Sequence, residues 1–392
     1  MKKGSFVSVL AMLLSSLFMI QCSTNPVTHQ RELHLVSQSQ EVKIGEENYV
    51  KSQQASGGLY TQSPGLTSYI QTVGQKLAKN SERPDLPFEF VILNDSIPNA
   101  WALPGGKIAI NRGLLVQLSS EAELAAVLAH EITHATARHG AKSIERGLIV
   151  NAGLAAGAIA LSDPEKPTAY NSALLYGSQI ASALIHLRYS RAAELEADHY
   201  GMLTMAKAGY DPMAAVKLQE LFIKLSEERR SNWLKGLFAS HPPSRDRAAA
   251  NLALAQTLPS HLETGEKRYQ EKIALLKKQD TAYKQHDKGQ ALLAKGDPAG
   301  ALQAANAAIQ SLPSEALFYS LKADSQAKLG DLNAALVSLD QGEKLNGQFF
   351  YIPLQKGKIL AQMGDKSNAK AAFKRSFQLL PTEEAEAALK LL

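Results

Sequence analysis

The 392-residue chain contains a single cysteine, which excludes an internal disulfide bond as a source of stability. It also lacks a dense basic tract interleaved with aromatic side chains, because aromatic residues make up only 6% of the chain and the lysines and arginines behind its net charge of +5 are scattered. Nucleic-acid binding is therefore not indicated. The apolar run over residues 147–161 is shorter than the roughly 20 residues that a bilayer core requires. We expect a buried helix there, with a segment that dips into a membrane as the alternative.

A His-Glu-Ile-Thr-His stretch begins at His130, and the residues before it predict a helix. Ser120 and Glu123 have the spacing of a capping box, and the Ala and Leu residues that follow favour helix. His130 and His134 then share one helix face and can bind one metal ion, while Glu131 projects roughly 100° round the axis. This arrangement is the front half of a zinc hydrolase site, in which the glutamate accepts a proton from metal-bound water. The alternative is a surface helix with incidental histidines.

A catalytic zinc ion needs a third protein ligand and an open coordination position, and the best candidate ligand is Glu194. The sequence around it has no helix breaker before Gly201, so Glu194 and Asp198 share a helix face. Asp198 is therefore placed to hold a ligating imidazole. Glu196 points about 160° away from Glu194 and is expected in solvent. The alternative for Glu194 is an ordinary ion pair with a nearby arginine.

Several stretches together resemble a known family, the His-Glu-x-x-His zinc endopeptidases related to CAAX prenyl proteases, and within it the soluble bacterial branch with a C-terminal repeat domain. Besides the metal motif, the similar stretches are Asn-Pro-Val-Thr at 25–28, Arg-Pro-Asp-Leu-Pro-Phe at 83–88, Asn-Ala-Trp-Ala-Leu-Pro-Gly-Gly at 99–106, Asn-Arg-Gly-Leu-Leu at 111–115, Ala-Arg-His at 137–139 and Ser-Arg-Ala-Ala-Glu-Leu-Glu-Ala-Asp at 190–198. The resemblance implies that His130, His134 and Glu194 bind zinc and that Glu131 is the general base. It also implies a role in outer-membrane protein quality control.

His241 begins a rigid His-Pro-Pro turn before a new helix. In the periplasmic relatives of this family, a histidine in this loop can occupy the open zinc position, which would keep the enzyme latent until the loop moves. The alternative is a histidine that only fills the start of the next helix. The oxyanion formed during hydrolysis needs a donor as well, and Tyr189, His241 and Arg245 are candidates that the sequence does not rank. His139 falls outside the i, i+4 pairing with His134 and is expected to be a structural or rim imidazole.

Residues 99–110 predict two short strands joined by a tight turn, because Pro104 presets φ and the two glycines that follow supply positive φ. The free edge of the first strand would accept an extended peptide by backbone pairing, which selects for unfolded chain more than for sequence. The residues of this predicted substrate edge are Asn99, Ala100, Trp101 and Ala102. Trp101 either lines a substrate pocket or belongs to the core.

The dipeptide Gly-Asp recurs at residues 296, 330 and 364, which is the 34-residue period of tetratricopeptide repeats. The units run approximately over residues 282–315, 316–349 and 350–383, and a short helix caps them. Stacked helix pairs make a concave surface that binds peptide or protein. The alternative is a domain that only packs on the protease and shields its cleft.

The N-terminus has the basic, apolar and cleavage regions of a secretory signal. Cys22 directly follows the apolar run and fits a lipid-modified N-terminus, although Gln21 stands where lipoprotein cleavage sites usually have a small residue. We favour lipidation at Cys22 over simple secretion with an incidental thiol. By analogy with lipoprotein sorting, Ser23 indicates a periplasmic protein anchored to the outer membrane.

The sequence thus predicts a mostly helical α+β protein with a gluzincin-type zinc metallopeptidase domain that contains a small sheet, followed by an all-α tetratricopeptide-repeat domain. The predicted segments are a signal peptide (1–21), an N-terminal arm (22–45), the metallopeptidase domain (46–260), a helical bridge (261–281) and about three repeats (282–392). The predicted activity is hydrolysis of peptide bonds in unfolded or misassembled envelope proteins, with one Zn²⁺ per chain. The repeats would recruit substrate or a protein partner such as outer-membrane assembly machinery. The alternative is a chaperone or assembly factor for outer-membrane proteins whose zinc site is normally latent.

Overall fold

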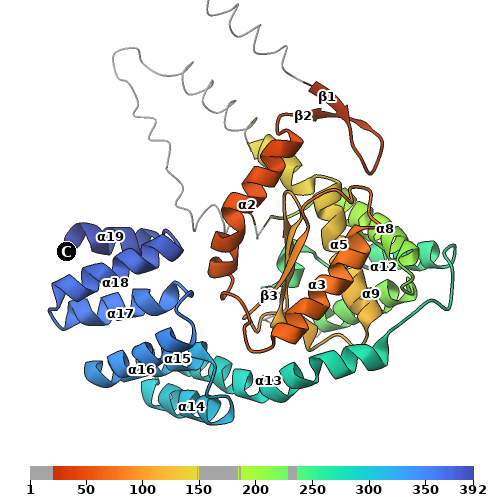
Figure 1. Cartoon of the computed structure of the whole chain (residues 1–392). Coiled ribbons are helices and arrows are strands. Elements are labelled where there is room, and N and C mark those ends of the chain that lie inside the picture. Colours follow the sequence, from red (N-terminus) through yellow and green to blue (C-terminus); the bar gives the residue numbers. More distant parts are fainter. Residues whose placement is uncertain (1–20, 148, 150–183, 185–186, 228–235) are drawn as a thin grey trace, which may run out of the picture.

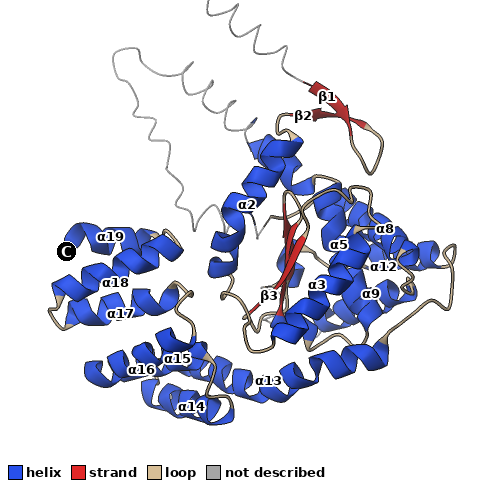
Figure 2. Cartoon of the chain, in the orientation of Figure 1, coloured by secondary structure: helices blue, strands red, loops and turns tan. Residues whose placement is uncertain are grey.

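The computed structural model describes residues 21–147, 149, 184, 187–227 and 236–392. Figure 1 shows a larger mixed domain and an array of helical repeats, joined by one long helix, α13 (Glu266–Ala294). Figure 2 shows that helices dominate the described part. The strands of this part lie in the N-terminal half of the sequence. Residues 1–20 of the predicted signal peptide, and most of the predicted buried helix at 147–161, lie outside the described residues. None of the helices placed in the structure combines the length and apolarity that a bilayer crossing requires.

The small sheet has three strands in the order β3 (Glu89–Leu93), β5 (Lys107–Asn111), β4 (Ala100–Leu103). β3 is parallel to β5, and β4 is antiparallel to it. The predicted turn joins β4 to β5, with φ of +78° at Gly105 and +86° at Gly106. A Cβ atom at Gly105 would lie 2.7 Å from Cα of Val42, so only glycine fits this turn against α2 (Gln38–Ala55). Within the described chain, β4 is therefore an edge strand.

Helix α5 (Glu121–Thr136) is the central element of the larger domain and is buried on nearly all sides, which explains its many small alanines. It packs against α3 (Pro64–Ala78), α8 (Arg191–Lys207) and α9 (Met213–Glu227). Ser120 caps it by accepting a hydrogen bond from the Glu123 amide at 3.1 Å. The Glu123 carboxylate, however, binds the amide and hydroxyl of Ser119 and not the Ser120 amide. The predicted capping box is thus only half formed.

The remaining elements of the larger domain frame this core. They are β1 (Gln21–Thr24), β2 (Arg31–His34), α4 (Arg112–Leu115), α11 (Leu237–Ser240) and α12 (Arg245–Ala255). β1 and β2 form a separate antiparallel pair, in which Cys22 lies opposite Leu33. Helix α12 packs on α8 and α9, so it closes the side of the domain next to the metal-motif helix.

Helix α13 belongs to both domains. Its first half buries Tyr269, Ile273 and Leu276 in the core of the larger domain, and its second half pairs with α14. Because the helix runs without a break through the predicted boundary between residues 281 and 282, the predicted bridge is rigid. The guanidinium carbon (Cζ) of Arg112 lies 3.4 Å from the ring centroid of Tyr283 on this helix. This cation–π contact fastens the first repeat to the sheet domain.

The repeat domain stacks pairs of antiparallel helices. After α13 come α14 (Pro298–Ser311), α15 (Ala316–Lys328), α16 (Leu332–Leu345), α17 (Tyr351–Gln362), α18 (Lys366–Leu379) and α19 (Glu383–Leu391). The Gly-Asp period has a local cause. Each glycine takes a left-handed φ between +81° and +90° to end one helix, and each aspartate caps the next helix by accepting a backbone hydrogen bond.

Candidate metal centre

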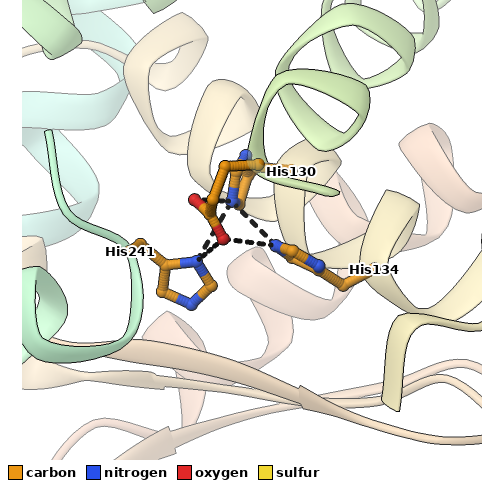
Figure 3. A group of neighbouring side chains, drawn as sticks. His130, His134 and His241 are labelled. Atoms are coloured by element: carbon orange, nitrogen blue, oxygen red, sulfur yellow. Dashed lines mark hydrogen bonds and ion pairs between the residues drawn. The ribbon is translucent and has the colours of Figure 1, made fainter. Parts of the chain in front are cut away.

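Four side chains converge on one point between α5, α8 and the turn after α11. They are His130, His134, Glu194 and His241, and one donor atom from each lies within 4.8 Å of all the others. The Nε2 atoms of His130 and His134 are 3.0 Å apart, and Nε2 of His134 is 3.4 Å from Oε1 of Glu194. Figure 3 shows the three imidazole rings turned toward a common centre. The structure therefore brings together the two predicted ligands of α5 and the predicted third ligand of α8.

The donor chemistry of this group fits a divalent cation. Nδ1 of His130 is 2.9 Å from the carboxylate of Asp198, which can only accept a hydrogen bond, so a neutral His130 turns a lone pair on Nε2 toward the centre. Glu194, which is 2% exposed, adds a buried carboxylate there. Burial opposes a charge on His130, but the hydrogen bonds to Asp198 and Glu194 outweigh it and raise the pKa of this ring to about 10. The cluster thus favours a positive charge at its centre, and imidazole and carboxylate donors suit zinc.

Glu131 lies beside the centre and differs from its neighbours in having few partners. It is 1% exposed, burial raises its pKa, and its Oε2 makes no hydrogen bond with any described residue. Its other oxygen, Oε1, is 3.6 Å from Nε2 of His241. Glu131 also lines a cavity of about 50 Å³ together with apolar side chains of α5 and α9, such as Val127, Leu218 and Phe222, and with polar ones such as His241 and Asn251. A buried carboxyl oxygen without a partner is rare in native structures and points to a reactive role.

Asp198 has the position that the helix periodicity predicts, next to His130, and a residue that the prediction missed holds it there. Arg247 of α12 forms two hydrogen bonds with the Asp198 carboxylate, at 2.6 and 2.7 Å. Its Nη1 also lies 2.9 Å from Oε2 of Glu194. Arg247 is 4% exposed, so this buried guanidinium neutralises two carboxylates and fixes their orientation.

The structure corrects the prediction for Arg245. Its side chain is 86% exposed and pairs with Glu227 at 3.2 Å, away from the metal centre, so it is no oxyanion donor in this structure. The reason is the start of α12. Ser244 is the N-cap and accepts a hydrogen bond from the Arg247 amide, which turns Arg247 inward and leaves Arg245 in the first turn facing solvent. Recognising Ser244 as an N-cap would have favoured Arg247.

Two aromatic predictions have different outcomes. The ring of Tyr189 stacks on His134, with ring centroids 4.0 Å apart, so it lies at the metal centre and stays a candidate for substrate contact. Trp101 lies in a core cluster with Tyr49 and Leu103, and its ring meets that of Tyr49 edge to face. It is 3% exposed, so it belongs to the core and does not line a substrate pocket.

His139 and Glu196 are closer to the site than the sequence suggested. His139 is 3% exposed, and its Nδ1 is 2.7 Å from Nδ1 of His134. On its far side, Nε2 of His139 is 3.2 Å from Oε1 of Glu196. Of the two alternatives for His139, the structure agrees with the structural imidazole and not with one at the rim. Glu196 is 22% exposed and contacts His139, so it is not fully in solvent as expected.

The predicted substrate edge adjoins the segment that carries His241. The carbonyl of Pro98, just before β4, accepts a hydrogen bond of 2.9 Å from the Leu237 amide. Gly236 permits this approach, since a Cβ atom there would lie 2.3 Å from the Pro98 oxygen. Residues 99–102 are buried in this arrangement, and their role as a substrate edge stays a prediction.

Comparison with known proteins agrees with this geometry. Residues 64–254, which include all four converging side chains, match the model of peptidase family M48, and residues 354–390 match a tetratricopeptide repeat. The chain carries an M48 metallopeptidase domain. The family implies a metal ion, and the converging donors of this domain fit one.

Curated relatives match the M48 domain and its surroundings. The mitochondrial metalloendopeptidase OMA1 of Schizosaccharomyces pombe is 32% identical over 57% of this chain and 63% of its own length. The beta-barrel assembly-enhancing protease of Yersinia pestis is 32% identical over 53% of this chain and 40% of its own length, and that of Escherichia coli is 29% identical over 55% and 43%. The chain thus spans less than two thirds of these relatives. Among solved structures, the Yersinia enterocolitica chaperone SycD matches 31% of this chain and 97% of its own, at 15% identity and a TM-score of 0.28.

Proposed function

We propose that this protein is a zinc-dependent endopeptidase that hydrolyses peptide bonds of unfolded or misassembled envelope proteins. The observation that carries the proposal is the convergence of His130, His134 and Glu194 beside Glu131, whose Oε2 accepts no hydrogen bond from a described residue. A zinc ion held by these three ligands would supply a Lewis acid that lowers the pKa of a water molecule to about 7 and polarises the substrate carbonyl.

Glu131 is the proton carrier of this proposal. Its buried Oε2 has no competing hydrogen bond from a described residue and can take a proton from the attacking water. Because burial raises the pKa of Glu131, its carboxylate takes up this proton more readily and holds it until the more basic departing amine accepts it.

The substrate and location parts of the proposal rest on other features. An edge strand at residues 100–103 suits an extended, unfolded chain, which would add to the sheet by backbone pairing. The names of the Yersinia and Escherichia relatives concern beta-barrel assembly, which agrees with the predicted signal sequence and with the proposed lipidation of Cys22. We therefore place the protein in the periplasm, anchored to the outer membrane.

The repeat domain is proposed to recruit substrate or a protein partner. A cavity of about 500 Å³ lies between the repeats and the sheet domain. Asp287 and Asp324 line it from the repeats, and Asp95 and Arg112 line it from the opposite side. A segment held in this cavity would touch both domains, so partner binding and the position of the protease domain would be linked.

The test of the proposed function is the Glu131→Gln variant on a permanently unfolded substrate such as reduced and alkylated lysozyme. General-base catalysis contributes about 10²- to 10⁴-fold, so we expect cleavage to fall by at least 100-fold while zinc content stays at one per chain. Glu220→Gln, at an exposed position of α9, is the matched control and should cleave like the wild type. Equal cleavage by wild type and Glu131→Gln would refute the proposal.

His241 gives the proposed enzyme a latent state. Its Nδ1 is 3.0 Å from Oε1 of Glu194 and 3.3 Å from Nε2 of His130, where it takes the position a substrate would need. The Leu237–Pro98 hydrogen bond holds its segment in place. We expect His241→Ala to raise cleavage of the unfolded substrate, because the fourth position becomes free. A rate at or below that of the wild type at full zinc occupancy would count against latency, and His199→Ala, exposed on α8, is the control.

The observed position of His241 also favours a second candidate function. If the site stays blocked in the cell, the protein would act as a chaperone or assembly factor, with the repeats delivering clients to a membrane machine. Complementation separates the two candidates. Full cellular activity of Glu131→Gln, together with loss of activity on deletion of the repeats, would establish the chaperone role.

A further inference from the structure

The Ala-Arg-His stretch after α5 interrupts the helix with a turn and brings His139 to the metal centre. α5 ends at Thr136, and Arg138 then adopts a left-handed conformation with φ of +63°, which non-glycine residues rarely take. Arg138 is 4% exposed and is held in place by the carboxylate of Glu41 and the carbonyl of Val36. This anchored turn places His139 against His134, although a straight helix would carry a residue five positions on to another face.

The contacts of His139 fix the direction of each hydrogen bond in a short chain. An ionised carboxylate only accepts, so Glu196 accepts from Nε2–H of His139 at 3.2 Å. Nδ1 of His139 therefore carries a lone pair and accepts from Nδ1–H of His134 at 2.7 Å. With its proton on Nδ1, His134 turns the lone pair of Nε2 toward His130 and Glu194.

We propose that His139 is a positioning residue for the metal ligand His134 and that Glu196 anchors it from outside. The inference rests on the metal site of the proposed function and extends it to two residues that bind no metal. Side chains two positions apart on a helix point about 160° apart, so Glu196 does not share the face of Glu194, and the imidazole of His139 spans the remaining distance. α8 thus supplies one ligand and, through Asp198 and Glu196, the outer carboxylate for each histidine of α5.

The test compares two replacements of His139 in the full-length chain. His139→Leu keeps most of the volume and removes the acceptor, whereas His139→Gln retains an amide oxygen that can accept from Nδ1–H of His134. Zinc affinity is measured by competition with a fluorescent chelator, and the metal environment by the visible absorption of the Co²⁺-loaded protein. Loss of an outer partner weakens metal binding about 10- to 100-fold, so we expect a loss in this range and an altered Co²⁺ spectrum for His139→Leu. His139→Gln should restore most of the affinity.

The controls separate positioning from support of the fold. His199→Leu, on the exposed side of α8, should bind zinc like the wild type. Unfolding of the metal-free proteins is measured in parallel. If His139→Leu and His139→Gln lose folding stability alike, while zinc affinity and the Co²⁺ spectrum stay those of the wild type, the positioning role is overturned.

A second variant covers the case in which His139→Leu does not fold. Glu196 is 22% exposed, so Glu196→Leu leaves the core intact and removes only the outer anchor. We expect a smaller, several-fold loss of zinc affinity, and unchanged affinity in a folded Glu196→Leu protein would overturn the inference. If the wild-type chain bound no zinc, the proposed function and this inference would both fail. If the variants bound zinc as tightly as the wild type, only the positioning role would fail.

Discussion

Two buried carboxylates lie at opposite ends of α5 and have opposite surroundings. At the N-terminal end, Glu121 uses both oxygens: it accepts from the hydroxyls of Tyr69 and Tyr210 at 2.6 and 2.8 Å, and from Arg268 at 2.5 and 2.7 Å. At the C-terminal end, Oε2 of Glu131 has no hydrogen-bond partner in the described part of the chain. Both side chains are nearly inaccessible, at 4% and 2% exposure, so burial alone does not distinguish them.

The difference separates a structural charge from a reactive one. A buried charge destabilises a fold unless hydrogen bonds and an opposite charge compensate it. The partners of Glu121 come from α3, from the segment before α9 and from α13, so this carboxylate fastens the repeat-bearing helix to the domain core. Glu131 has much weaker compensation, because His241 lies 3.6 Å from one oxygen and the other has no hydrogen bond, and burial still raises its pKa. Such a group is available to a reactant. Partner satisfaction, more than burial, distinguishes these two acidic residues.

The largest effect that we expect from this comparison is on the free energy of unfolding of Glu121→Gln. Glu121→Gln loses the charge-assisted hydrogen bonds to Arg268, and we expect the free energy of unfolding to fall by about 2 kcal/mol after allowing for the 43% exposure of Arg268. Glu131→Gln removes a weakly compensated buried charge and should leave this free energy unchanged or raise it. Urea unfolding followed by circular dichroism measures both, and equal losses in the two variants would break the comparison.

The pH dependence of the free energy of unfolding is the control for the loss expected in Glu121→Gln. Burial opposes the charge of Glu121, but the hydrogen bonds from Arg268, Tyr69 and Tyr210 outweigh it and lower the pKa of this carboxyl. A lowered native pKa means that the ionised group stabilises the fold above its ordinary pKa of 4.5 and that this contribution is lost as the pH falls through the native value. The stability gap between wild type and Glu121→Gln should therefore be full at pH 7 and shrink below pH 4.5.

The metal ligands were predictable because their spacing is local and regular. His130 and His134 lie one turn apart on a helix that its own composition predicts, and Glu194 and Asp198 repeat that spacing on α8. The repeats were predictable for a similar reason, since each Gly-Asp pair ends one helix and caps the next at a fixed period. Patterns of this kind depend only on the geometry of a single helix or turn.

The missed residues depend on one local helix cap and on contacts between distant segments. Arg247 enters the site only because the cap at Ser244 sets the rotation of α12, and His139 enters it only because Arg138 is held in a left-handed turn by Glu41, 97 residues earlier. The partners of Glu121 are separated by up to 147 residues from it and share no spacing. No periodicity in one segment predicts these distant contacts, so the role of His139 and the partners of Glu121, unlike Asp198, needed the tertiary structure.

The smallest expected effect compares two tyrosines, one at each end of α5. Tyr69→Phe removes a single hydrogen bond to the Glu121 carboxylate, while Arg268 still binds the same oxygen, so we expect a loss of about 1 kcal/mol in the free energy of unfolding. Tyr189→Phe keeps the ring that stacks on His134, and its hydroxyl makes no hydrogen bond with a described residue, so stability should change by less than about 0.5 kcal/mol. The same urea titrations resolve the two. If Tyr189→Phe lowered the free energy of unfolding as much as Tyr69→Phe does, polar contacts would also stabilise the metal end of α5. The contrast between the two carboxylates would then no longer separate structure from chemistry.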